Sequence, residues 1–128
     1  MQGDHLEFSV RHERVNGAAV SNGVAIVDLR GELSALAGEA LDRALAQARQ
    51  QNSSIILLNL EGVSYINSTG IALIIGLLIQ ATKAGLRLRA CGLTQHYVQV
   101  FKVARLSEYI RVFPDEASAL SSIEKNEL

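Results

Sequence analysis

The sequence predicts an α/β domain in which a mixed sheet of four to five strands packs against about four helices. Short apolar or β-branched runs alternate along the chain with segments whose apolar residues recur at helical spacing. One run, Ser53–Leu60, is apolar over nearly its whole length, which is typical of a central strand covered on both faces. We expect residues 1–128 to form a single domain with its core between about residues 6 and 123.

The first part of the chain is expected to supply two strands. Leu6–Val15 half-alternates between apolar and polar residues, as an edge strand does. The pairs Asn16-Gly17 and Asn22-Gly23 that follow are turn signals. Val24–Leu33 is mostly apolar and rich in β-branched residues, which favours a second strand.

A first helix is expected near Leu36–Gln51, with Ser34 as a candidate N-cap. Glu39 and Arg43 are spaced for an i,i+4 ion pair on its outer side. The inner side is predicted from five apolar residues at helical spacing: Ala37, Leu41, Ala44, Leu45 and Ala48.

The central strand Ile55–Leu60 is followed by a second helix, Thr69–Ala84, which begins near Ser68 and stops at Gly85, a favourable residue after a helix end. We expect Leu57, Leu58 and Ile75 to be core residues.

The rest of the chain predicts two further pairs of elements. Residues 86–91 alternate leucine or alanine with arginine and read as a strand, and residues 108–113 as a short last strand. Helices are expected at Gln95–Ala104, capped by Thr94, and at Asp115–Ile123, where Pro114 suits the first helical position.

Composition excludes several classes of function. The net charge is −1 and the 12 basic residues are scattered, which gives no footprint for nucleic acid or an anionic membrane. The longest apolar stretch, Ile71–Ile79, is shorter than the roughly 20 residues of a membrane span, and no secretory signal is visible, so a cytoplasmic protein is expected. The single cysteine, Cys91, ends an apolar run and is interpreted as a buried small hydrophobe.

Common catalytic and cofactor motifs are missing from the sequence. It contains neither a GxxxxGK[ST] phosphate loop nor a GxGxxG dinucleotide motif. His5, His12 and His96 lack metal-ligand spacing with one another or with Cys91, so we expect no metal and no cofactor. In a serine hydrolase the nucleophilic serine lies in a G-x-S-x-G turn, but Ile66 stands where Ser68 would need the first glycine. His96 would have to be the base, and nothing in the sequence directs an acid at it. We therefore expect no enzymatic activity.

The hydroxyl-rich start of the second helix, Asn67-Ser68-Thr69-Gly70, is the candidate functional site. Helix capping explains one of the three polar residues but not all three. Gly70 in the first turn costs roughly 1 kcal/mol relative to alanine, and close approach by another backbone would justify it. A small, exposed helix N-terminus also tolerates an added phosphate, because the helix dipole favours negative charge there.

The second helix is apolar on nearly all sides, more than one core-facing stripe requires. Two explanations stay open. The sheet and the third helix bury most of these side chains, or part of the helix forms an apolar partner surface beside Ser68.

The segment "IILLNLEGVSYI" followed by "NSTGIALIIGLL" resembles the anti-sigma-factor antagonists of the STAS domain family. The similarity extends to "VAIVDLRGEL" before an alanine- and leucine-rich helix and to "AGLRLRACGL" before another helix, and so spans nearly the whole chain. The resemblance implies a STAS-type α/β sandwich. In that family a strand ends in Asp-Ser-Ser/Thr-Gly, and the first serine is phosphorylated by a partner that is both a serine kinase and an anti-sigma factor.

Carried over to this chain, the resemblance implies phosphorylation at Ser68, with Thr69 and Gly70 completing the motif and Asn67 replacing the acidic residue. It also implies partner switching in transcription regulation: the unphosphorylated protein binds the kinase/anti-sigma factor, and phosphate ends that binding. Asn67 removes a charge beside Ser68 but keeps the size and capping ability of aspartate. Alternatives are a structural STAS component that is never phosphorylated and a small-ligand-binding STAS module. The oligomeric state is not predicted.

Overall fold

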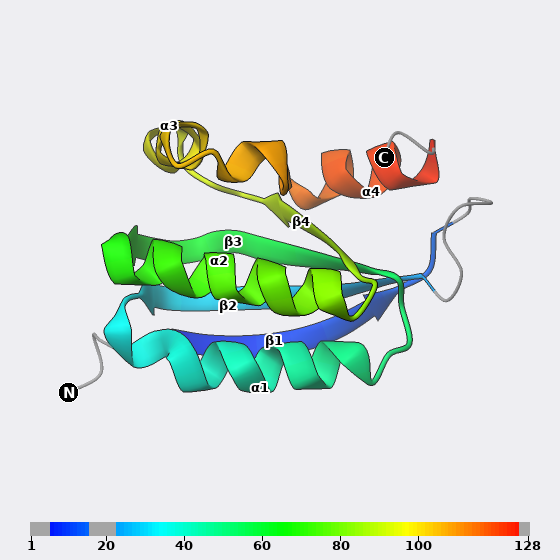
Figure 1. Ribbon diagram of the computed structural model, residues 1–128. Helices are drawn as coiled ribbons and strands as arrows, with labels where there is room; N and C mark the ends of the chain where they lie inside the picture. The colour runs from blue at the N-terminus through cyan, green and yellow to red at the C-terminus, as the bar shows by residue number, and fades with distance from the viewer. Residues whose placement is uncertain (1–5, 16–22, 126–128) are drawn as a thin grey trace.

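The computed structural model describes residues 6–15 and 23–125 and contains a five-stranded mixed sheet (Figure 1). The strands follow one another across the sheet in chain order. The first is antiparallel to the second, and the other pairs are parallel. This confirms the predicted mixed sheet. The strands are β1 (Leu6–Glu13), β2 (Val24–Leu33), β3 (Ile55–Ile66), β4 (Arg87–Cys91) and β5 (Arg111–Phe113).

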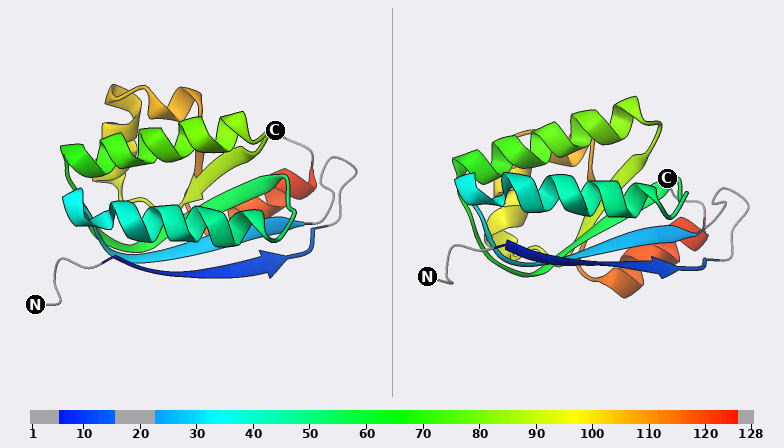
Figure 2. Two further views of the ribbon diagram at one scale, coloured as in Figure 1. Left: turned by 60° about the horizontal axis from the view of Figure 1, so that its bottom comes forward. Right: turned by 90° about the horizontal axis from the view of Figure 1, so that it is seen from below.

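Within the described residues, four α-helices cover the sheet, as the sequence predicts. Figure 2 shows α1 and α2 side by side on one face of the sheet and α4 on the other. Two 3-10 turns, η1 (Ala35–Ala37) and η2 (Leu106–Glu108), precede α1 and β5. The helices are α1 (Gly38–Arg49), α2 (Ser68–Lys83), α3 (Gln95–Val103) and α4 (Glu116–Glu124).

The first half of β3 is buried on both faces, because its successive side chains point to opposite sides of the sheet and helices cover both sides there. Leu58 faces α1 and α2 in the larger core, whereas Leu57 belongs to the smaller core under α4. Both are nearly inaccessible to solvent, so these two core predictions are confirmed. The strand also runs six residues beyond the predicted end at Leu60, because Gly31–Leu33 of β2 still pair with it there. It therefore leads directly to Asn67.

The prediction that Ile75 is a core residue is wrong. Its side chain is 39% exposed, although the preceding residue, Ile74, is only 1% exposed. The buried side of α2 is formed by residues three or four apart, namely Gly70, Ile74, Leu77 and Ala81. Ile75 lies one residue, and so about 100°, away from that side.

Two predicted helix starts differ from the structure. Ser34 precedes the 3-10 turn η1 rather than an α-helix, and its side chain makes no capping hydrogen bond there. Pro114 lies outside α4, since Asp115 is the N-cap and its side chain accepts a hydrogen bond from the Ser118 N–H at 2.8 Å. The predicted cap Thr94 is confirmed, because its hydroxyl accepts from the Tyr97 N–H.

Smaller predictions are confirmed where the structure describes the residues. Glu39 and Arg43 form the expected ion pair at 3.5 Å. Gly85 follows α2 with a φ of +76°. Cys91 is buried, and burial with nearby carboxylates raises the pKa of its thiol to about 12, which keeps it protonated and unreactive. The turn signals Asn16-Gly17 and Asn22, like His5, lie outside the described residues.

A polar network joins the sheet to α4 on the face opposite α1 and α2. Arg11 of β1 donates to both carboxylate oxygens of Asp28, at 2.6 and 2.9 Å, and to those of Glu116 in α4. The Asn59 amide donates to Asp28 as well, at 2.8 Å. Hydrogen bonds from Arg11 and Asn59 hold the pKa of Asp28 below its ordinary value.

Asp28→Asn should lower the free energy of unfolding at pH 7 by about 1 kcal/mol and reduce its dependence on pH in acid. The pKa of Asp28 is depressed in the folded state. The carboxylate therefore contributes its full stabilisation above the pKa of the unfolded chain, about 3.9, and loses it as the pH falls through the pKa of the folded state. Urea denaturation at about pH 7 and about pH 3 measures this. As a control, Glu39→Gln removes an exposed ion pair and should change the free energy of unfolding little at either pH. If wild type and Asp28→Asn lost the same free energy of unfolding between the two pH values, the prediction would be contradicted.

Candidate functional site

The candidate site is the junction of β3 and α2, where Asn67 separates the strand from the helix. Asn67 has an extended backbone, and its side-chain oxygen accepts a hydrogen bond from the Gly70 N–H at 2.9 Å. Capping is thus carried out by Asn67. Ser68 is the first helical residue, and both Ser68 and Thr69 are exposed. Their hydroxyls have no hydrogen-bond partner among the described residues, so neither hydroxyl stabilises the fold through a hydrogen bond.

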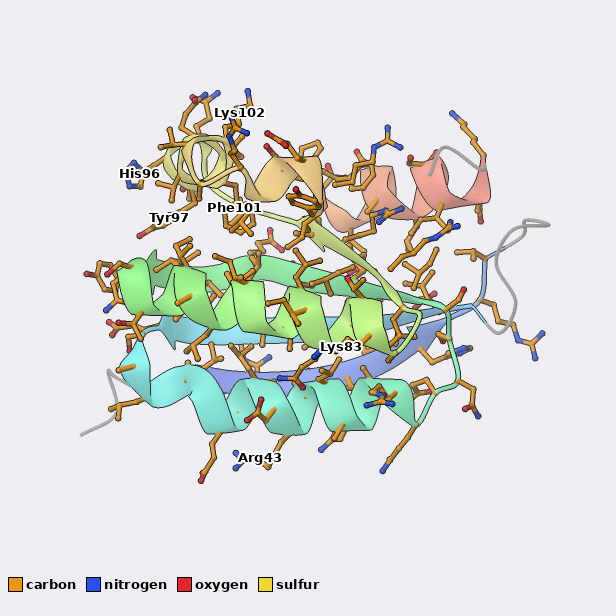
Figure 3. The ribbon with its side chains drawn as sticks, viewed as in Figure 1. Arg43, Lys83, His96, Tyr97, Phe101 and Lys102 are labelled. Atoms are coloured by element: carbon orange, nitrogen blue, oxygen red, sulfur yellow. The ribbon has the colours of Figure 1, made fainter. Side chains whose placement is uncertain are left out.

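Two further hydrogen bonds fix the backbone just before Ser68. The Asn67 N–H donates to the Leu33 carbonyl at the end of β2, at 3.1 Å. The Ile66 N–H donates to the Tyr97 hydroxyl at 3.0 Å, and Tyr97 and Phe101 project from α3 toward the sheet (Figure 3). The junction is therefore held from β2 on one side and from α3 on the other.

Gly70 allows the helix to begin against β2. A Cβ at this position would collide with the carbonyl oxygen of Leu33, so only glycine fits without a shift of backbone. The close approach of another backbone, expected from the sequence, is confirmed here. The contact places the helix start beside the end of β2.

The helix start can accept negative charge. Asn67 satisfies the Gly70 N–H, whereas the N–H groups of Ser68 and Thr69 have no partner among the residues that the structure describes. Unpaired N–H groups at the positive end of a 16-residue helix stabilise a nearby anion. A phosphate on the Ser68 hydroxyl would lie beside them.

An exposed stripe runs along α2 from Ser68. Ser68, Ala72, Ile75 and Ile79 are separated by four, three and four residues, so they lie on one side of the helix. Ile75 and Ile79 are 39% and 50% exposed. We call these four residues the α2 stripe. It shows that apolar side chains are accessible beside Ser68, while the sheet and neighbouring helices bury only the other side of α2.

Other side chains that could act in catalysis or bind a metal do not form part of the site. His96 is exposed on α3, and its ring lies edge-on to the Tyr97 ring with the two ring centroids 4.8 Å apart. No hydrogen bond joins His96 to Ser68. Within residues 6–15 and 23–125, no cluster of histidine, cysteine, aspartate or glutamate is suited to hold a metal ion. None of the described helices is long and apolar enough to span a membrane.

Sequence reasoning missed the two residues that anchor the junction from outside. Leu33 was expected only as a strand residue, and Tyr97 lies 31 residues from Ile66. No local pattern indicates such contacts, because they depend on how the end of β2 and helix α3 come to lie against the end of β3.

Tyr97→Phe should lower the free energy of unfolding by about 1 kcal/mol, because the Ile66 N–H would lose its acceptor in a buried position. Amide hydrogen exchange should accelerate at Ile66 and Asn67 and stay unchanged in α1. Unchanged exchange at Ile66 would show that the Tyr97 hydroxyl does not hold the junction.

The comparisons with known proteins agree with this architecture. The STAS domain family model matches residues 17–119. A curated relative, the anti-sigma-B factor antagonist of Staphylococcus aureus, is 30% identical over 86 residues, covering 67% of this chain and 80% of the relative.

Solved structures with low sequence identity share the fold. An anti-sigma factor antagonist from Mycobacterium paratuberculosis matches with a TM-score of 0.71 at 17% identity, over 93% of this chain and 94% of that one. The Bacillus cell fate determinant SpoIIAA in its phosphorylated form matches with a TM-score of 0.64 at 19% identity, over 91% and 99%. The family match over most of the chain and the curated relative show that this chain belongs to the STAS domain family.

Proposed function

We propose that this chain is an anti-sigma-factor antagonist, a cytoplasmic regulatory protein that acts by binding rather than by catalysis. Its partner would be a serine kinase that is also an anti-sigma factor, bound while Ser68 is unphosphorylated and released once Ser68 carries phosphate. The curated relative is named an antagonist of this class, and two solved proteins of this fold carry the same description. The observation that carries the assignment of the residue is the exposed, unpaired hydroxyl of Ser68 at the start of α2.

The α2 stripe is the surface proposed for the partner. Its apolar members, Ala72, Ile75 and Ile79, continue from Ser68 along one side of the helix. An interface centred there would desolvate the neutral hydroxyl of Ser68 at one end. Phosphate would place about −1.5 to −2 charges at that edge and so oppose binding without altering the fold.

Asn67 in place of the acidic residue is compatible with this switch. The side-chain oxygen of Asn67 performs the capping that a carboxylate would perform, so the local backbone does not depend on the charge. A phosphate on Ser68 would also meet less like-charge repulsion. A kinase that contacts the carboxylate of its usual substrate would phosphorylate this chain more slowly, and Asn67→Asp should then raise the rate.

The test is incubation with ATP and an anti-sigma factor kinase encoded in the same genome, followed by mapping of the modified residue. Wild type and Thr69→Ala should incorporate one phosphate at residue 68, and Ser68→Ala none. Labelling that persists in Ser68→Ala would contradict the assigned site.

A structural STAS component that is never phosphorylated is the competing role. Intact-mass measurement of protein isolated from its own cells distinguishes the two, because only a switch should be found partly with added phosphate. A mass that is always unmodified, together with no labelling in vitro, would favour the structural role.

A further inference from the structure

Arg89, in the middle of β4, is a buried cation without a counter-charge. It is 8% exposed and is the one charged residue that is buried in the described part of the chain. Its Nη1 donates to the Leu88 carbonyl at 3.1 Å, which is its one interaction with residues 6–15 and 23–125 that lowers the cost of burial. Buried charges in proteins are ordinarily paired, because an unpaired one is costly. Arg89 is an exception to that rule within the fold.

The unused donors of Arg89 reach the surface. A guanidinium carries N–H donors on each of its nitrogen atoms, and Nε and Nη2 of Arg89 make no hydrogen bond with the residues that the structure describes. Over the same residues, no side-chain nitrogen or oxygen that lacks a partner is fully buried. The two nitrogen atoms therefore touch solvent, at the tip of a side chain that is otherwise covered.

Arg87 places a second cation on the same side of the strand. Alternate residues of β4 share a face, and Cys91, next in this series, belongs to the core under α4, whereas Leu88 belongs to the larger core (Figure 2). Arg87 is exposed, and its side chain has no ion pair or hydrogen bond among the described residues. Two residues span about 6–7 Å of strand, so an anion between the two side chains can contact both.

The carboxylates of this face lie toward the other end of β4. Burial raises the pKa of the Cys91 thiol, and four carboxylates raise it further: Glu116, Asp115, Asp28 and Glu61. The pKa of Arg89 is lowered by burial and then by the charges of Arg87 and Arg111, and no described carboxylate raises it. The fold therefore places no anion of its own, among the described residues, beside Arg89.

Arg111 lies beside Arg89 but is not counted as part of the site. It pairs in register with Arg89 on β5, and its guanidinium lies over the Phe113 ring, 5.4 Å from the ring centroid, so it already has interactions of its own. The charge to be balanced is that of Arg87 and Arg89. A carboxylate would neutralise one of these guanidinium groups, whereas a dianion neutralises both and offers each of them oxygen acceptors.

We propose that Arg87 and Arg89 bind a tetrahedral dianion, phosphate or sulfate, on the α4 face of β4. Oxygen atoms of the ion accept hydrogen bonds from Nε and Nη2 of Arg89, and the guanidinium of Arg87 contacts it from the solvent side. The ion supplies the counter-charge that Arg89 lacks, so binding stabilises the folded chain. The site is on β4, apart from the α2 stripe, and goes beyond the proposed partner switching at Ser68.

The experiment titrates the full chain with sodium phosphate, sodium sulfate or sodium acetate at about pH 8, where phosphate is mostly a dianion. Each series is compared with sodium chloride at the same ionic strength. Phosphate, sulfate or both should raise the melting temperature in a saturable way, and their comparison identifies the preferred ion. Acetate should bind at least about tenfold more weakly.

Variants assign the binding to the two arginines. Arg89→Met, which fills much of the same volume without a charge, should fold and weaken dianion binding at least about tenfold. Arg87→Gln, at an exposed position, should weaken it about threefold or more and keeps the test valid if Arg89→Met does not fold. Arg49→Gln removes an exposed arginine of α1 and should respond to the dianions as wild type does.

Nitrogen-15 chemical shifts locate the bound ion. The largest changes are expected at Nε of Arg89 and at the amides of residues 87–89, with Ser68 and Thr69 unaffected. Equal dianion affinity in wild type and Arg87→Gln, shifts confined to the start of α2, or acetate binding as tight as that of the dianions would overturn the proposal. A response that follows ionic strength alone would show an adventitious ion only and would overturn it as well.

Discussion

Replacing Ser68 with aspartate should weaken binding of the kinase partner about a hundredfold while leaving the fold intact. Ser68 is exposed at the end of the α2 stripe, so a partner that covers Ala72 and Ile75 also covers residue 68. A carboxylate desolvated at that edge costs several kcal/mol, and about 3 kcal/mol corresponds to a hundredfold in the dissociation constant. The free helix N–H groups tolerate the charge in the unbound protein. Titration calorimetry gives the binding constant, and thermal melting checks the fold.

Thr69→Asp is the matched control. It adds the same charge to the same helix end, but residue 69 lies about 100° around the helix from the stripe. It should therefore weaken binding much less than Ser68→Asp, and Ser68→Ala should bind like wild type. Equal losses for the two aspartate variants would mean that charge at the helix end, not contact at Ser68, opposes binding. If only Ser68→Asp had a lowered melting temperature, its loss of binding would be due to unfolding rather than to the charge at the interface.

The order of elements was predictable because each has a strong local signal. The apolar run of β3, the alternation in β4 and the glycine after α2 all depend on neighbours within a few residues. The candidate site was predictable for the same reason, since Asn67 to Gly70 are consecutive. Local chemistry also indicated that Gly70 would meet another backbone.

The rest depends on contacts distant in sequence. Ile75 and Ile74 are equally apolar, and only the packing of α2 on the sheet decides which is buried. Tyr97 reaches Ile66 across 31 residues, and the length of β3 follows from its pairing with Gly31–Leu33.

Gly70→Ala should destabilise the protein by about 2 kcal/mol or more, although helix propensity alone favours alanine by roughly 1 kcal/mol. The added Cβ would meet the Leu33 carbonyl oxygen and the Leu33 Cβ, so the helix start or the end of β2 must move. Overpacking of this kind typically costs about 1–3 kcal/mol, and more where backbone rather than a flexible side chain must yield. The steric term therefore outweighs the propensity gain. Urea denaturation measures the difference.

Gly76→Ala separates the two terms, because Gly76 lies in the same helix and nothing stands within 4 Å of a Cβ added there. Only propensity acts at that position, so Gly76→Ala should stabilise the protein by about 0.5–1 kcal/mol. The shift forced by Gly70→Ala should also disturb the hydrogen bond from the Asn67 N–H to Leu33, so amide exchange at Asn67 should rise in that variant alone. If both alanine variants were stabilised to the same extent, Gly70 would not be in tight contact with β2. The start of α2 would then not be held in place by Leu33, and the fixed presentation of Ser68 would need another cause.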